Sequence, residues 1–210
     1  IKAYGTGLDF FTGDKASHSG LAHGPADGKA PGNFVRCVNG AENVYGLNDF
    51  VDNKDGTVSD LATDLNWQQN DDGQRREWAD ALAYCESLDL AGHQDWRLPD
   101  SKELQSIVDY DKTDFPAIDE SLFGITQDSE TLDYWTSTTF GDIKSHANVI
   151  VFGKALSKAG DQSEYTDWHG AGAQRSSIKT LEGQSLTDED LCSINACDID
   201  RPDNLVRCVR

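Results

Sequence analysis

Carboxylates are the most numerous side chains of this sequence that could do chemistry. Asp and Glu number 37, and ten of them lie between Asp100 and Asp133. Hard oxygen ligands on an irregular loop suit calcium, which takes about six to eight of them. A second cluster of carboxylates lies on both sides of the stretch CSINAC. We interpret it either as a calcium site or as a solvated acidic surface. The calcium ligands predicted there are Asp188, Asp190, Asp198, Asp200 and Asp203.

Cysteine is the other reactive residue type, and the chain has five of them. This content favours an oxidising compartment, hence a secreted, periplasmic or cell-surface protein. The odd number requires at least one thiol that is free or bonded outside the chain. Cys192 and Cys197 are separated by four residues, and their simplest interpretation is a local disulfide that closes a loop.

Complete catalytic patterns do not occur in the sequence. The five histidines form neither an HExxH pattern nor a paired Cys/His pattern that would predict zinc. There is also no GxSxG nucleophile elbow, P-loop or dinucleotide fingerprint. We therefore expect a protein that is not an enzyme.

The net charge excludes some classes of binding partner. With 18 basic and 37 acidic residues, the net charge is −19. Such a field repels phosphate backbones and anionic membrane surfaces, which excludes nucleic acid as a partner. No apolar run approaches the roughly 20 residues of a spanning helix, so no membrane span is expected.

Strand and helix patterns alternate after residue 47. The stretch 48–69 predicts two or three short strands with a hairpin turn at Asp55-Gly56. DYWTSTT and ANVIVFG predict two further strands, residues 154–203 are acidic and irregular, and LVRCVR predicts a closing strand. Two helices among antiparallel strands indicate an α+β domain.

Both helices have a clear buried face in the sequence. REWADALAYCESL places Trp78, Ala81, Leu82, Cys85 and Leu88 on one side of a helix. In DSKELQSIVDY, Asp100 and Glu103 predict a capping box, and the apolar residues that follow predict a buried stripe. That stripe consists of Leu104, Ile107 and Val108.

A near-repeat divides the chain. NFVRCVNG at residues 33–40 resembles the ending NLVRCVR at 204–210. Residues 1–40 are rich in Gly, Ala, His and Pro and cannot bury a core by themselves. We therefore expect an N-terminal arm over 1–40 that is similar to the tail of a preceding copy, followed by a domain over 41–210. An unpaired strand exposes backbone donors and acceptors, so Phe34–Val38 should pair with a sheet.

Several blocks in a familiar order resemble the Lcl C-terminal domain family, over about residues 41–210. They are NDFVDNKDGTVSDLATDLNWQQ, WADALAYCESLDLAGHQDWRLPDSKELQSIVDY, PAID, YWTSTT, GAGAQRS and LVRCVR. One departure is Asp64 and Asn66, where the family usually has Gly and Met. The resemblance implies a C-type lectin-like fold, with joined terminal strands, two helices, small sheets and a long loop region that binds ligands.

The same resemblance implies roles for the cysteines. Lectin-like domains join the first helix to the closing strand, which implies a Cys85–Cys208 disulfide worth about 4–5 kcal/mol by loop-closure entropy. The spacing of Cys192 and Cys197 is similar to the copper-binding pair of formylglycine-generating enzymes in the wider superfamily. Cys37 would pair with a preceding copy, stay free, or bond to another polypeptide.

These features predict a non-catalytic extracytoplasmic binding or adhesion module for a glycan, a protein or a surface. Its ligand-binding residues would be Tyr165, Asp167, Trp168 and Arg175. One alternative is a structural subunit of an extracellular assembly or filament, in which the chain self-associates or receives the preceding copy from another polypeptide. The other alternative is a copper oxidase of the formylglycine-generating type.

Overall fold

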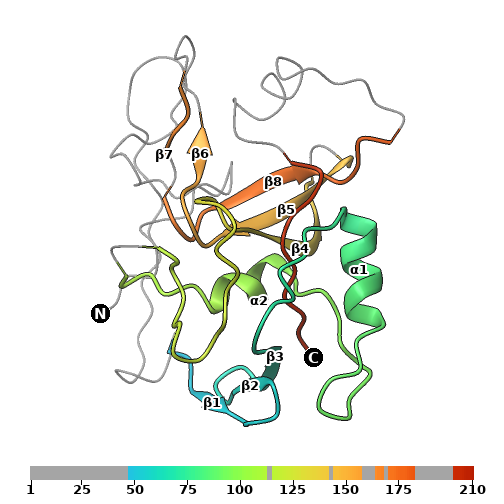
Figure 1. Ribbon diagram of the computed structural model, residues 1–210, viewed down its shortest axis with the longest axis vertical. Coiled ribbons are helices and arrows are strands. Elements are labelled where there is room, and N and C mark those ends of the chain that lie inside the picture. Colours follow the sequence, from blue (N-terminus) through green and yellow to red (C-terminus); the bar gives the residue numbers. More distant parts are fainter. Residues whose placement is uncertain (1–46, 113–114, 142–143, 158–163, 168–169, 183–200) are drawn as a thin grey trace.

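The computed structural model describes residues 47–112, 115–141, 144–157, 164–167, 170–182 and 201–210. In these residues the chain forms two three-stranded antiparallel sheets, a two-stranded ribbon and two helices (Figure 1). The predicted α+β class, with small antiparallel sheets and two helices, is confirmed.

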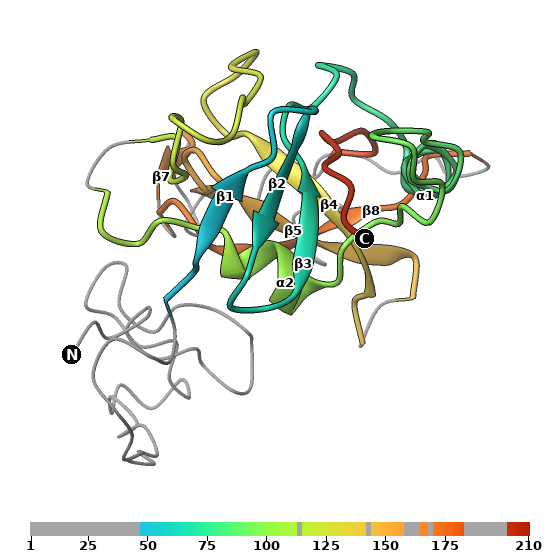
Figure 2. The ribbon, with the colours of Figure 1, turned by 90° about the horizontal axis from the view of Figure 1, so that it is seen from below.

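The first sheet is a meander of three short strands. It consists of β1 (Phe50–Asp52), β2 (Thr57–Asp60) and β3 (Leu65–Gln68), side by side in that order (Figure 2). The turn between β1 and β2 contains Asp55-Gly56, as predicted, and Gly56 adopts φ +90, which an L side chain rarely tolerates.

A buried carboxylate fixes the C-terminal end of β2. Asp60 accepts hydrogen bonds from the backbone N–H groups of Asp49 and Ala62. It also accepts them from the side chains of Asn48 and Thr63. Four donors compensate the burial of this charge, because a buried carboxylate without them would be costly. Asp60 therefore ties the chain that enters β1 to the turn that leaves β2.

The first helix packs one face inward. Helix α1 (Trp78–Glu86) buries Ala81 and Cys85, two members of the predicted stripe. The other predicted members, Trp78, Leu82 and Leu88, are partly buried and pack against the same cluster. Trp78 also donates its indole N–H to the Thr136 carbonyl at 2.9 Å, which joins the start of α1 to the second sheet.

The second helix begins at the predicted capping box. In α2 (Ser101–Ser106), the Asp100 carboxylate accepts from the backbone N–H of Glu103, and the Glu103 carboxylate accepts from that of Asp100. The predicted apolar stripe is buried; it consists of Leu104, Ile107 and Val108.

The second sheet forms the centre of the molecule. Its strands are β4 (Asp133–Thr139), β5 (His146–Val151) and β8 (Gln174–Ile178), in the order β4–β5–β8. Every residue of β5 is buried, since that strand is paired on both edges and covered on both faces. β4 and β5 confirm two predicted strands.

The region predicted to be irregular contains regular structure, which corrects the expectation for 154–203. β8 completes the second sheet, and β6 (Leu156–Ser157) pairs with β7 (Thr166–Asp167) as a short ribbon. The sequence QRSSI has no apolar alternation to predict a strand. It becomes one because the central strand β5 offers its free edge, so tertiary context outweighs local preference.

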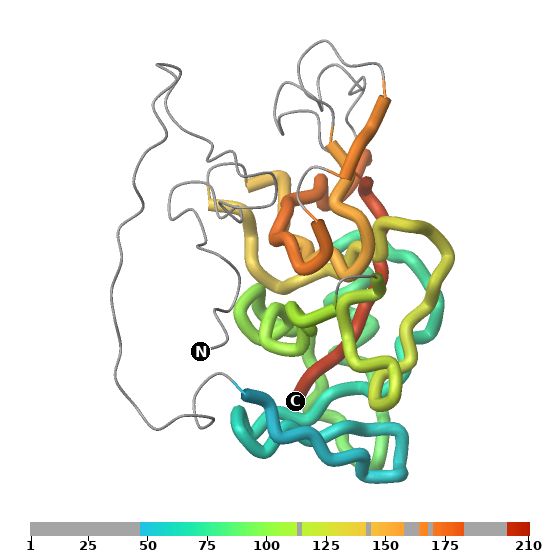
Figure 3. The backbone as a smooth tube through the Cα atoms, turned by 90° about the vertical axis from the view of Figure 1, so that its left-hand side faces the viewer, coloured from blue at the N-terminus to red at the C-terminus, as the bar shows by residue number. Residues whose placement is uncertain are grey.

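The closing segment, residues 204–210, is extended but is not a regular strand, in contrast to the prediction. It makes single bridges to four separate segments, at Trp67, Arg76, Arg97 and Tyr134. Asn204 and Leu205 each have a different partner, and Val209 bridges both Trp67 and Arg97, so no continuous ladder forms. The segment thereby runs from the second sheet to β3, as its dark red trace shows (Figures 1 and 3).

Side chains of the closing segment alternate between two core clusters. Leu205 and Val209 belong to the cluster that contains Trp67, Tyr134 and the α2 stripe. Val206 and Cys208 belong to the cluster under α1. This alternation follows from the two-residue period of an extended chain. One segment therefore joins both halves of the core.

The disulfide implied by the family resemblance is present. Cys85 on α1 is bonded to Cys208 with a Cα–Cα distance of 5.5 Å, and both residues are completely buried. The predicted Cys192–Cys197 bond, and Cys37, lie outside the described residues.

Two further expectations concern membrane spans and the N-terminal arm. No helix within it is long and apolar enough to cross a membrane. The arm over 1–40 and the boundary at residue 41 fall outside the described residues, so this division into domains stays a prediction.

The disulfide closes a loop with a sequence separation of 123. Replacing both cysteines (Cys85→Ala with Cys208→Ala) should lower the free energy of unfolding by about 5 kcal/mol, because the unfolded chain regains loop entropy. Urea unfolding would measure the change. Cys37→Ala is the control and should leave the stability unaltered, and a double variant as stable as the parent would contradict the role assigned to this bond.

Candidate functional site

The predicted ligand-binding residues lie on two different elements. Tyr165 directly precedes β7 and is 41% exposed. Asp167 is the last residue of β7. Asp167 accepts hydrogen bonds from the backbone N–H groups of Ala155 and Gly170, both at 3.0 Å. Arg175 is a partly buried residue of β8, opposite Val149. Trp168 lies outside the described residues.

The predicted calcium ligands are almost all beyond the described ranges. Asp203 is exposed, whereas Asp188, Asp190, Asp198 and Asp200 are outside the described residues. Within the ranges that the structure describes, no three His, Cys, Asp or Glu side chains converge as a metal would require. Calcium therefore stays a prediction.

The acidic stretch between Asp100 and Asp133 uses many of its carboxylates in structural contacts. Glu103 forms two hydrogen bonds with Arg97, and Glu120 pairs with Lys112 at 2.9 Å. Asp119 accepts from Ser121, while Glu130 pairs with Lys154 at 2.6 Å. For these carboxylates the structure favours local stabilisation over a shared cation site.

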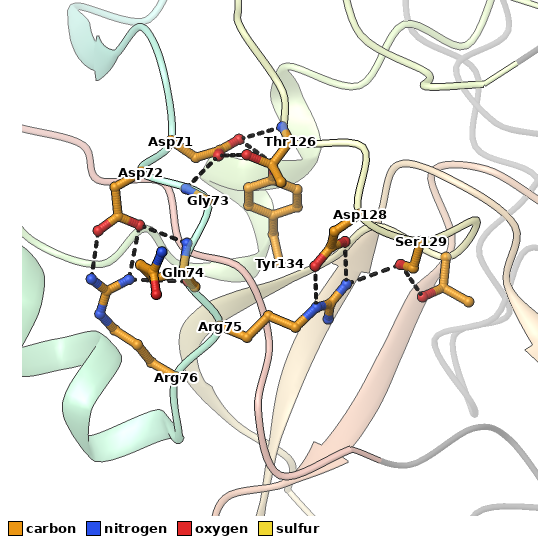
Figure 4. Close-up of polar contacts among 11 residues, drawn as sticks. Asp71, Asp72, Gly73, Gln74, Arg75, Arg76, Thr126, Asp128, Ser129 and Tyr134 are labelled. Atoms are coloured by element: carbon orange, nitrogen blue, oxygen red, sulfur yellow. Dashed lines mark hydrogen bonds and ion pairs between the residues drawn. The ribbon is translucent and has the colours of Figure 1, made fainter.

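Among the described residues, one densely bonded polar cluster was not predicted from the sequence. It surrounds the segment 70–76, NDDGQRR, which connects β3 to α1 (Figure 4). Figure 4 shows Asp71 facing Thr126, and Arg75 facing Asp128 and Ser129, from the loop before β4, while Asp72 and Arg76 face each other. The cluster has a buried part around Asp71 and an outer part around Arg75 and Arg76.

Asp71 is the centre of the buried part, with its side chain 2% exposed. One carboxylate oxygen accepts from the Gly73 N–H and the Thr126 hydroxyl. The other accepts from the Thr126 N–H at 2.9 Å and from the Tyr134 hydroxyl at 2.5 Å. Burial raises the pKa of Tyr134 far above its usual range, so this phenol keeps its proton and remains a donor.

Arg207, from the closing segment, lies against the same carboxylate. Its side chain is completely buried, and one guanidinium nitrogen is 3.7 Å from Asp71. The guanidinium donates to the carbonyl oxygens of Gln68, Gln69 and Gly124, each at 2.7 Å. A buried charge needs such partners, and here the carbonyls come from two separate parts of the chain, the end of β3 and Gly124.

Two ion pairs form the outer part of the cluster. Arg75 donates two hydrogen bonds to the Asp128 carboxylate, at 2.7 and 2.9 Å, and a third to Ser129. Arg76 pairs with Asp72 and stacks over the Tyr84 ring at 4.0 Å. These contacts hold the segment 70–76 between α1 and the loop before β4.

The charged groups of this cluster hold parts of the scaffold in position. Its carboxylates and guanidinium groups bind one another and the backbone, and Tyr134 cannot supply a base while its pKa stays raised. Sequence analysis missed Asp71 and Arg207, although a signal existed. An arginine on an apolar segment, LVRCV, at a position that shares its face with Leu205 and Val209, indicates a buried charge with a dedicated partner.

The Tyr134 hydroxyl should contribute more than an ordinary tyrosine hydroxyl. Tyr134→Phe keeps the ring but removes a donor to a buried carboxylate, so we expect a loss of about 1.5–3 kcal/mol in the free energy of unfolding. Tyr84→Phe is the matched control, since it removes only a bond from the neutral Gln68 amide and should cost about 1 kcal/mol. Equal losses in urea unfolding would contradict the central role of Asp71.

The Arg75–Asp128 pair should add a pH-dependent contribution. Hydrogen bonding from Arg75 lowers the pKa of Asp128, so the pair stabilises the fold above about pH 4 and loses that effect as pH falls through the lowered value. Asp128→Asn should therefore cost about 0.2–1 kcal/mol at pH 7 and progressively less as the pH is lowered toward 2. Glu86→Gln, at an exposed position on α1, is the control and should not change the free energy of unfolding at either pH value. Unfolding curves at both pH values provide the measurement, and an equal loss at both would refute the assignment.

Comparison with known proteins identifies one family. The Lcl C-terminal domain family matches residues 56–169. The match includes both helices, the segment 70–76, and the strands β2 to β7. No curated protein and no solved structure matches the chain. Because the family match extends over more than half of the sequence, the chain belongs to the Lcl C-terminal domain family.

Proposed function

We propose that this chain is a non-catalytic, extracytoplasmic binding or adhesion module with a C-type lectin-like domain. Its contact surface is the β6–β7 ribbon with the residues beside it. The observation that carries the proposal is Tyr165, a large aromatic side chain that is 41% exposed next to β7. Tyrosine in such a position supplies a rigid apolar face and a hydrogen-bonding hydroxyl, which is why it is frequent at binding surfaces.

The placement of the ribbon supports a contact role. β6 and β7 extend away from the β4–β5–β8 sheet, at the end of the molecule opposite β1–β2–β3 (Figure 1). Asp167 anchors the ribbon through backbone donors on both of its sides, Ala155 and Gly170. Tyr165 is thus presented from a fixed base, so a ligand would pay less ordering entropy on binding.

The polar cluster supports the non-catalytic part of the proposal. In the described part of the chain, Asp71 and Arg207 carry the most buried ionic contact, and both bind groups of the scaffold. Their side chains are 2% and 0% exposed, which keeps them from a ligand. The buried Cys85–Cys208 bond supports an extracytoplasmic location, because structural disulfides persist in oxidising compartments.

Charge defines the class of ligand. Glu164, Thr166 and Asp167 surround Tyr165 and are all exposed, in a chain with a net charge of −19. A neutral glycan, a basic protein surface, or a glycan bound through calcium is compatible with this environment. A polyanionic ligand would be repelled.

Binding to immobilised glycans tests the proposal. The full chain should bind neutral glycans of a panel more strongly than sulfated ones, and Tyr165→Ala should weaken that binding by at least about tenfold. Leu61→Ala is the matched control, since Leu61 is 63% exposed but lies between β2 and β3, away from the ribbon. Both measurements are made with millimolar calcium and again with a chelator, which shows whether a metal takes part.

Two results would count against the proposal. Absence of binding to every glycan and to basic peptides, with and without calcium, would leave the module without a ligand. Equal effects of Tyr165→Ala and Leu61→Ala would move the contact surface away from the ribbon. A calcium site should also raise the melting temperature, by RT ln(1 + [L]/Kd) in free energy, and unchanged melting would favour the solvated acidic surface.

A further inference from the structure

Two exposed aromatic side chains are attached to the same short stretch of the chain. In the described residues, the large apolar side chains with substantial exposure are Val51, Leu61, Phe115, Tyr165 and Leu181. Phe115 and Tyr165 are the aromatic ones among them, and Phe115 is 44% exposed. The stretch that holds both is 152–157, which leads from the end of β5 into β6 (Figure 1).

Phe115 is held beside the first part of this stretch. The Ala117 N–H donates to the Phe152 carbonyl at 2.8 Å, and the Ala117 carbonyl accepts from the Asp109 N–H at 2.8 Å. The Lys154 ammonium lies 5.6 Å from the centre of the Phe115 ring. A cation is attracted to the face of an aromatic ring, so the ring has a preferred position next to Lys154.

Lys154 is itself fixed against the loop before β4. Its backbone N–H donates to the Glu130 carbonyl and its ammonium to the Glu130 carboxylate, each at 2.6 Å. Gly153 passes so close to the carbonyls of Glu130 and Thr131 that a Cβ at this position would collide with both. The stretch and the loop therefore form one closely packed base under Lys154.

Tyr165 is attached to the other end of the stretch. Ser157 pairs with Thr166, the residue after Tyr165, and the Ala155 N–H donates to the Asp167 carboxylate at 3.0 Å. The hydrogen bond to Glu130, and to a smaller extent the Asp167 charge, raise the pKa of Lys154. Lys154 therefore stays charged, at a place between the attachments of the two aromatic residues.

The groups between the two rings can bind hydroxyl groups. An ammonium has three donors, and the Glu130 carboxylate uses one of those of Lys154. The side chains of both residues are partly exposed. A sugar ring has an apolar C–H face, which fits an aromatic ring, and a rim of hydroxyls, which bind charged donors and acceptors. The surface offers both kinds of contact.

The positions of the two rings set the size of the ligand. Phe115 lies next to Lys154, whereas Tyr165 lies next to Thr166, opposite Ser157. An extended chain advances about 3.3 Å per residue, so the three residues from Lys154 to Ser157 can span about 10 Å. A ligand that touches both rings must bridge this interval, which favours an oligosaccharide over a single sugar.

We propose that Phe115 and Lys154 extend the contact surface of the ribbon, and that its ligand is a neutral oligosaccharide that packs one sugar on Tyr165 and another on Phe115. This inference rests on the proposed function, because it uses the same surface around Tyr165. It adds a second aromatic contact, a donor between the two contacts, and a lower limit to the length of the ligand.

Binding as a function of ligand length tests the inference without any substitution. Soluble neutral homo-oligosaccharides of one to six sugar units are titrated into the full chain in a calorimeter. The affinity should rise at least about tenfold from the shortest to the longest, since the second contact becomes intramolecular once the first is made. Equal affinity for all lengths would overturn the inference.

Substitutions then locate the second contact. Phe115→Ala should remove most of the gain with length, whereas Phe115→Tyr keeps the ring and should keep the gain. Leu181→Ala is the matched control, because Leu181 is similarly exposed but follows β8, and it should change no affinity. If Phe115→Ala fails to fold, as a melting curve would show, Lys154→Ala replaces it and should also reduce the gain.

The outcomes separate this inference from the proposed function. If the Phe115 and Lys154 variants lose no more affinity than Leu181→Ala, the extension is overturned. The proposed function still stands in that case if Tyr165→Ala weakens binding. If no neutral sugar of any length binds, this inference fails, and the proposed function then depends on binding to basic peptides alone.

Discussion

Arg207 brings a positive charge to a place from which water is excluded, and the fold surrounds it with three carbonyl oxygens and the Asp71 carboxylate. Removing an ion from water costs several kcal/mol, and the attraction to a partner at 3.7 Å offsets only a part of that. The full set of acceptors is therefore needed at once. Those acceptors come from the end of β3, the segment 70–76 and Gly124, so these parts must be in their native positions together.

The closing segment that carries Arg207 also links the two core clusters. The domain therefore cannot be divided into independent halves. Leu205 and Val209 complete one cluster, while Val206 and Cys208 complete the other. The contacts between Gln68 and Cys208 join residues separated by 140 positions. Ordering such a distant segment has a loop-closure cost, and the Cys85–Cys208 bond lowers it by restricting the unfolded chain.

Local patterns predicted the local structure well. The capping box of Asp100 and Glu103, the stripe of α1 and the Asp55-Gly56 turn depend on neighbours within a few residues, and the structure has all three. β8 was missed because a polar pentapeptide becomes a strand only through the free edge of β5. The closing segment was predicted as a strand since its alternation is correct, but its four partners are distant in sequence.

The candidate sites also differ in how far local sequence could predict them. Asp71 and Arg207 could be inferred only by asking why an arginine occurs within an apolar segment, because their meeting depends on the whole fold. Tyr165 and Asp167 follow from the family resemblance and from the irregular composition of their region, but the ribbon that carries them was not visible in the sequence. Pattern reading is thus strongest for the scaffold and weakest for contacts between remote segments.

The scaffold and the ribbon are subject to different constraints. A change in the closing segment disturbs two clusters, a disulfide and a buried charge, so each residue there is restricted by several contacts. Tyr165 and its exposed neighbours lie outside the three core clusters, and Asp167 fixes their base through two backbone groups. Tyr165 and its exposed neighbours can therefore change with little cost to the core, whereas Ser157 of β6 is buried. Exposed positions on a fixed scaffold are those at which a protein can vary its surface while the domain keeps its fold.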